Sequence, residues 1–197
     1  MKRGIPVEWY QYDPSELMAE NLAILSSVLA VGDMDVLSVE VPSSLGGEGI
    51  LLTEPVSYAG ITLAVNTEDA NSQNLSDVSG DVYVGQEWFV RETIEAANSN
   101  IVMLPFQSYV PDFLEGFKED GLPFALLDIE GWYLLKKNEN LDIRLLEPVE
   151  YVDGCYQVLD ENVQRAVDTF LQNIKEDGTL KEISEKWFGE DVSVERK

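Results

Sequence analysis

Short β-type segments alternate with amphipathic helical segments along most of this chain, and this alternation constrains the fold more than any other feature. The stretch "DVYVG" is typical of a strand, "QEWFVRETIEAAN" of a helix, and "IVMLP" of another strand. Strands that alternate with helices of this length usually form βαβ units with a parallel sheet. The sequence therefore predicts an α/β fold with mostly parallel sheets.

The same patterns place the remaining elements. A break is expected at Pro55, inside a long β-type stretch. The capping residues of "DPSE" predict the start of a helix, and Gly32 predicts its end. Further strands are predicted at 4–12, 34–41, 50–65, 124–128, 141–148 and 154–159, and further helices at 13–31, 110–121 and 129–138.

Two helices are predicted close to the end of the sequence. Apolar residues between 163 and 174 recur at helical spacing, and Gly178 is a typical residue at which a helix ends. Thr179 and Glu182 match a capping box, which predicts that a second helix begins at once. The side chains expected to anchor the second helix are Leu180, Ile183, Trp187 and Phe188, and Trp132 is expected to be a core anchor as well.

The charge and the reactive residues exclude several functions. The chain has 13 basic and 37 acidic residues, a net charge of -24, which argues against binding nucleic acid or an anionic membrane. It has no histidine, and Cys155 is its only cysteine, so we expect no imidazole chemistry, no zinc or transition-metal site and no internal disulfide. We also expect no cofactor. A hard cation held by carboxylates, as "GDMDV" weakly suggests, is the alternative. No apolar run is long enough to span a membrane, and the first residues do not form a signal peptide.

The segment "VQRAVDTFLQNIKEDGTLKEISEKWFGED" resembles the C-terminal end of a known family. These are the bacterial extracytoplasmic solute-binding proteins of the amino-acid ABC-transporter type (family 3, periplasmic-binding-protein-like type II), which end in a helix, a "dG(t/s)" turn and a short helix with "kWfG". "ELMAENLAILSSVLAVGDMDVLSV", "ILLTEPVSYAGITLAV", "LSDVSGDVYVGQEW" and "PFALLD" resemble earlier family segments in the same order. The resemblance extends from about residue 5 to about residue 193.

The resemblance implies a two-lobed clamshell. Residues 1–65 together with 153–197 would form the first lobe, residues 66–152 would form the second, and two crossing strands near 61–65 and 155–159 would form the hinge. The family's first strand, first helix and aromatic stacking residue would precede Ile5, so we expect the first lobe to lack them. The sheet edge left exposed in this way is a hazard for strand pairing and favours a homodimer.

The resemblance also implies a ligand site. Asp128 corresponds to the carboxylate that binds the ligand's α-ammonium, and Glu40 corresponds to a ligand-contacting serine. Glu87 lies in a loop that carries hydroxyl donors in the family, and the arginine that binds the α-carboxylate is absent from "VEVPSSLGGEG". Three acids without an answering base favour a cationic or amine-bearing ligand. The candidate cation–π walls are Trp9, Tyr58 and Trp88.

Simpler interpretations of these residues remain open. Asp128 follows an apolar strand and is also suited to cap the next helix. Glu40 and Glu87 are also typical of solvated surface acids, and Trp9 and Trp88 of packing residues. The ligand site therefore stays an expectation at this level.

The function that these features favour is capture of a small amine-bearing or amino-acid-like ligand between two lobes, for ABC transport. The permease of such a transporter would be the partner, and the parent protein would be extracytoplasmic. The alternatives are a ligand-sensing ectodomain of a signalling protein and a non-binding scaffold of the same fold. An enzyme of the dehydratase kind, with Glu40 or Glu87 as acid or base, is less compatible with the sequence, and we expect no enzymatic activity.

Overall fold

The computed structural model describes residues 8, 35–46, 51–85, 88–105, 121–137 and 141–196. The strand predicted at 4–12, except for Glu8, and the helices predicted at 13–31 and 110–121 lie outside these residues. In the described part of the chain, no helix has the length and apolarity needed to cross a membrane.

Eight described strands form one sheet, in the order β1-β8-β3-β6-β4-β5, with β2 also paired to β8 and β7 to β3. The strands are β1 (Val36–Val41), β2 (Leu51–Leu52), β3 (Ser57–Asn66), β4 (Gly80–Val84), β5 (Ile101–Pro105), β6 (Phe124–Leu127), β7 (Ile143–Leu145) and β8 (Glu150–Val158). The helices are α2 (Trp88–Ala97), α4 (Asp128–Lys137), α5 (Glu161–Glu176) and α6 (Thr179–Phe188). The predicted α/β class is confirmed. The break expected at Pro55 is also confirmed, since it lies between β2 and β3.

The sheet is mixed, which differs from the expectation of mostly parallel sheets. Only the pairs β4–β5 and β4–β6 are parallel among the described strands. Strands β3 and β8 pair antiparallel with all their described neighbours. The physical reason is that β3 and β8 run in opposite directions to each other and to their other neighbours. Antiparallel pairs of this kind do not need the helical crossovers that parallel pairs need.

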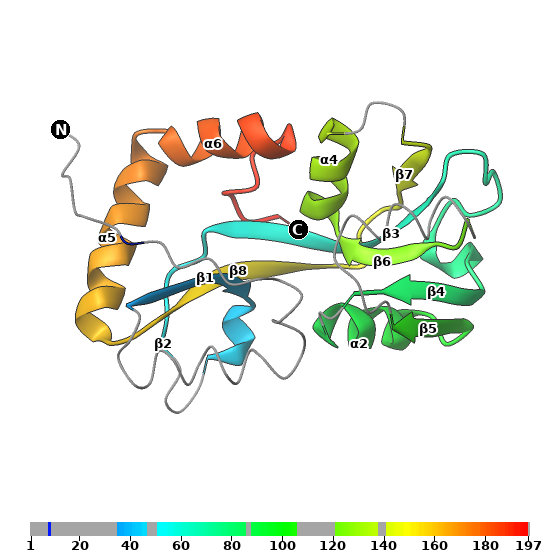
Figure 1. Cartoon of the computed structure of the whole chain (residues 1–197), viewed down its shortest axis with the longest axis horizontal. Helices are drawn as coiled ribbons and strands as arrows, with labels where there is room; N and C mark the ends of the chain where they lie inside the picture. The colour runs from blue at the N-terminus through cyan, green and yellow to red at the C-terminus, as the bar shows by residue number, and fades with distance from the viewer. Residues whose placement is uncertain are drawn as a thin grey trace.

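Strands β3 and β8 lie side by side and run lengthwise through the middle of the molecule (Figure 1). Their paired residues run from Ser57 opposite Gly154 to Ile61 opposite Glu150. In the picture, β1, β2 and α5 lie toward one end of the two strands, and β4, β5, α2 and α4 toward the other. The two long strands are thus suited to be the hinge, although the division into lobes at residues 65 and 153 stays a prediction.

The core lies on both faces of the β3 half that pairs with β6. On one face, the apolar side chains of β3 pack with β4, β5 and α2. On the other face, Ala64 and Phe124 pack with residues of α4 and β7. Burial of both faces explains why β3 is an almost continuous apolar run. The central buried residues of the first face are Ile61, Leu63, Val65, Val82, Val84, Val90 and Ile94.

Helices α5 and α6 occur where they were predicted, but two details differ. The predicted capping box at Thr179 and Glu182 is wrong, because Gly178, at φ 80°, is the N-cap residue and no side chain caps the helix from that position. Asp177 instead accepts a hydrogen bond from the Thr179 backbone at 2.9 Å. Trp187 and Ile183 are each 44% exposed, so they are not core anchors. Trp187 lies beside the Lys137 and Lys186 ammonium groups, 5.8 and 5.2 Å from its ring.

Candidate functional site

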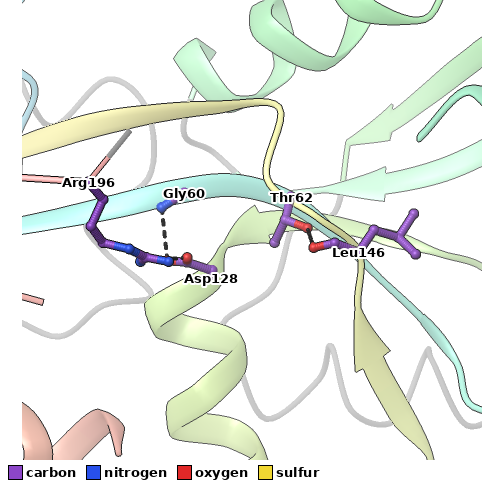
Figure 2. A network of polar contacts seen from close by, with 5 residues as sticks. All are labelled: Gly60, Thr62, Asp128, Leu146 and Arg196. Atoms are coloured by element: carbon purple, nitrogen blue, oxygen red, sulfur yellow. Dashed lines mark hydrogen bonds and ion pairs between the residues drawn. The ribbon is translucent and has the colours of Figure 1, made fainter. Parts of the chain in front are cut away.

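Asp128 lies at the junction of β6 and α4, next to the long strand β3. Strand β6 pairs with β3 up to Leu127 opposite Ile61, so the next residue, Asp128, comes beside Gly60. The Asp128 side chain is only 2% exposed. Its Oδ1 accepts a hydrogen bond from the Gly60 backbone N–H at 2.9 Å, as Figure 2 shows. The carboxylate is therefore held in one orientation against the backbone of β3.

The close approach at Gly60 requires a residue without a side chain. A Cβ atom on Gly60 would lie 2.8 Å from Oδ2 of Asp128 and 2.6 Å from the ring of Pro148. Leu146, two residues before that proline, is tied to the same strand, because its carbonyl accepts a hydrogen bond from Thr62 Oγ1 at 2.7 Å (Figure 2). The segment that carries Leu146 and Pro148 is thus fixed against β3. The Asp128 carboxylate fits beside Gly60 because that residue has no side chain.

The second oxygen of Asp128 binds a cation from the same chain. Arg196 Nη1 lies 2.7 Å from Asp128 Oδ2. The guanidinium carbon of Arg196 is also 4.7 Å from the ring centre of Trp132 and 4.6 Å from that of Tyr151. The expectation that no base answers the site acids is therefore wrong for Asp128. The reason is that Arg196 reaches this position only through the tertiary fold.

The segment that carries Arg196 is anchored by its first residues. Gly189, at φ 92°, ends α6 and redirects the chain toward β3. Val192 is buried against Ala59 and Ile129, and its carbonyl accepts a hydrogen bond from the Tyr58 N–H at 2.7 Å. This anchoring along β3 directs the chain toward Asp128.

Burial raises the pKa of Asp128 above its ordinary value. The hydrogen bond from Gly60 and the positive charge of Arg196 oppose this rise without cancelling it. The carboxylate therefore gains from any cation beside it, because a cation offsets part of the cost of keeping the charge out of water.

Removing the Arg196 charge should raise the pKa of Asp128 further. We expect the Arg196→Met variant to show this rise in a carboxyl ¹³C NMR titration of the full chain. Since the folded pKa lies above the unfolded one, stability falls as pH rises between the two values, and the variant should extend this fall to higher pH. Asp177, whose pKa is lowered by its hydrogen bonds to Thr179, serves as internal control and should not move. An unchanged Asp128 titration would contradict the ion pair.

Glu40 occupies a different position from Asp128. Its Oε2 accepts a hydrogen bond from Ser57 Oγ at 2.5 Å and lies where a Cβ on Gly154 would be. Although the residue as a whole is exposed, desolvation of this carboxylate end raises the pKa of Glu40, and the Ser57 hydrogen bond opposes the rise. Ser57 and Tyr58 are consecutive in β3, so their side chains point to opposite faces. Glu40 is thus on the Ser57 face, while Asp128 contacts Gly60, which shares a face with Tyr58.

Tyr58 lies in acidic surroundings. Burial raises the pKa of Tyr58, and the charges of Glu195 and Asp153 add to the rise. Cys155 in β8 is buried, and burial followed by the charges of Asp153 and Glu40 raises the pKa of its thiol to about 12. Cys155 is therefore protonated at neutral pH and is a packing residue rather than a nucleophile.

The other predicted ligand residues are less well placed by the structure. Trp9 and Glu87 lie outside the described residues, and Trp88 begins α2 without a described side chain. Ligand contact by all six candidates, Asp128, Glu40, Glu87, Trp88, Tyr58 and Trp9, stays a prediction. Sequence reasoning missed Arg196 and Tyr151 entirely, and it assigned Trp132 to the core alone. The described residues contain no group of three or more acids or cysteines arranged to hold a metal ion.

Comparisons with known proteins agree with this fold. The sequence model of the bacterial extracellular solute-binding proteins, family 3, matches residues 47–190. The chain belongs to this family. The resemblance stated above is thereby confirmed for most of the chain.

The three relatives described next share at most 24% of their residues with this family 3 chain. The probable amino-acid-binding protein YxeM of Bacillus subtilis (strain 168) is 24% identical over 215 residues, which span 100% of this chain and 74% of the relative. An ancestral cationic amino acid solute-binding protein has a TM-score of 0.73 at 17% identity, covering 94% of this chain and 79% of the other. The GluR0 ligand-binding core in complex with L-glutamate has a TM-score of 0.71 at 17% identity, covering 85% and 78%. These structures share the type II periplasmic-binding-protein fold.

Proposed function

We propose that this chain is an extracytoplasmic solute-binding protein that captures a small amino-acid-like amine for an ABC transporter. The observation that carries the proposal is the buried Asp128 carboxylate, with one oxygen held by Gly60 and the other on a cation. In this proposal the ligand's own cationic group takes the place of that cation. The chain binds its ligand between two lobes hinged by β3 and β8, and it performs no reaction on it.

The names of the relatives support an amino acid as the ligand class. One is a probable amino-acid-binding protein, and another is a cationic amino acid solute-binding protein. The acids around Tyr58 and the net charge of -24 favour a cationic solute over an anionic one. The family is one of extracellular proteins, which supports an extracytoplasmic location for the parent protein.

A ligand panel tests this proposal. We expect basic amino acids, and not acidic ones, to raise the melting temperature of the full chain. A ligand at 100 times its dissociation constant adds about 2.7 kcal/mol, which corresponds to a shift of about 5–10 °C at this chain length. The panel also holds neutral amino acids, polyamines and quaternary amines.

Two variants make the panel specific. Asp128→Asn should lose the ligand-induced shift, whereas Asp81→Asn, at an exposed position of β4, should keep it. A shift with neutral amino acids alone, or one that survives in Asp128→Asn, would contradict the proposed role of Asp128.

A second function is favoured by the Arg196 contact itself. A site already occupied by the chain's own guanidinium is compatible with a scaffold of this fold that binds no small molecule. Lack of any shift across the panel, in wild type and in an Arg196→Ala variant, would favour the scaffold.

A further inference from the structure

Arg196 has the surroundings of a bound ligand rather than those of a surface residue. Its guanidinium forms an ion pair with Asp128 and lies near the rings of Trp132 and Tyr151. We propose that Asp128, Trp132 and Tyr151 form a guanidinium site, that Arg196 is its internal occupant, and that a guanidinium-bearing solute replaces it.

The three walls of this site come from helix α4 and strand β8. Asp128 begins α4, Trp132 lies one turn later in the same helix, and Tyr151 lies in β8 directly opposite Gly60. The Asp128 carboxylate is oriented by the Gly60 N–H, which does not depend on Arg196. The site is therefore held by α4, β3 and β8, and its geometry should persist when Arg196 is removed.

The chemistry of the walls selects a planar cation. A guanidinium forms directional hydrogen bonds with a carboxylate in its own plane while its faces contact aromatic rings. An ammonium is a compact and strongly hydrated charge, so it gains less from two rings at 4.6–4.7 Å. We therefore expect guanidinium compounds to bind this site in preference to simple amines.

The internal occupant can leave without disturbing the core. Val192 is the buried anchor of the segment, whereas Val194 and Glu195 are exposed. The Arg196 side chain is itself 20% exposed. Release of Arg196 thus requires only the last described residues to move, while Val192 stays in contact with Ala59 and Ile129.

Chemical rescue tests the site with the full chain. Arg196→Ala should have a lower melting temperature than wild type, and methylguanidinium should restore part of it. At ten times its dissociation constant, the compound should raise the melting temperature of the variant by about 3–6 °C. Methylammonium at the same concentration should give a smaller rise. If Arg196→Ala does not unfold cooperatively, Arg196→Gln takes its place.

Two control variants decide whether the rescue is specific. Arg91→Ala breaks an exposed ion pair with Glu95 within α2, and methylguanidinium should not rescue it. The double variant Arg196→Ala with Asp128→Asn should also show no rescue. Equal effects of methylguanidinium on Arg196→Ala and Arg91→Ala, or rescue that persists without the Asp128 charge, would overturn the proposal.

Competition between Arg196 and an amino acid rests on the proposed function, whereas the guanidinium site does not. If Arg196 occupies the site, arginine should bind Arg196→Ala about tenfold more tightly than wild type, because the competing occupant is gone. Isothermal titration calorimetry measures both affinities. Equal affinities without methylguanidinium rescue would overturn the internal occupant and leave the proposed function intact. Rescue by methylguanidinium without binding of any amino acid would support the internal occupant and contradict the proposed function.

Discussion

Replacing Asp128 with alanine is expected to lower the free energy of unfolding by about 3 kcal/mol, the low end of the cost of breaking a buried ion pair. The substitution leaves the Gly60 N–H and the Arg196 guanidinium without their carboxylate. A buried donor without a partner costs about 1–3 kcal/mol. Because Arg196 is 20% exposed, water can solvate part of its charge, and the cost should not reach the upper end.

Urea denaturation of the full chain measures this loss. A double-mutant cycle then isolates the part of the loss that comes from the interaction between Asp128 and Arg196. The variants Asp128→Asn and Arg196→Met, alone and combined, give the coupling free energy of the pair, which we expect to be about 1–2 kcal/mol. Asp81→Ala, at an exposed position of β4, is the control and should change stability by less than about 0.5 kcal/mol. A coupling free energy near zero would mean that Arg196 does not contact Asp128 in solution.

Replacing Gly60 with alanine is expected to cost about 3 kcal/mol, the upper part of the usual range for overpacking a core. The new Cβ would lie 2.6 Å from Pro148 and 2.8 Å from Asp128 Oδ2. The proline ring is stiff, and the carboxylate is held by both Gly60 and Arg196, so neither neighbour can move without losing contacts. The added methyl group therefore has to displace β3 or break the Asp128 network.

Gly154→Ala is the matched comparison for Gly60→Ala. A Cβ on Gly154 would also be too close to its neighbours, but these are the ends of the Glu40 and Ser57 side chains. Glu40 is exposed and can turn toward solvent, so this variant should cost clearly less, about 1 kcal/mol. Both melting temperatures and urea midpoints check the difference. Equal losses in the two variants would contradict the proposed rigidity around Gly60.

Local patterns in the sequence were sufficient for most elements. The apolar runs of β3, β4 and β5 and the helical spacing of α5 and α6 are properties of neighbouring residues, and the structure has these elements close to the predicted positions. Resemblance to family 3 added the type II fold, which no single periodicity provides, and it marked Asp128 as a candidate. Gly178 was recognised as the end of the first closing helix and the start of α6 was predicted beside it, although the N-cap residue of α6 was assigned to Thr179 instead of Gly178.

The parts that the sequence did not determine depend on contacts between distant residues. Hydrogen bonding within one helix or turn is set by residues a few positions apart, so its pattern is visible in the sequence. The Asp128–Arg196 pair joins residues 68 positions apart, and the Thr62–Leu146 hydrogen bond joins residues 84 apart. The exposure of Trp187 likewise depends on how α6 packs against α4. The sequence alone thus determined the elements and the family, whereas only the tertiary structure decided which cation faces Asp128, because folding brings Arg196 there from the far end of the described chain.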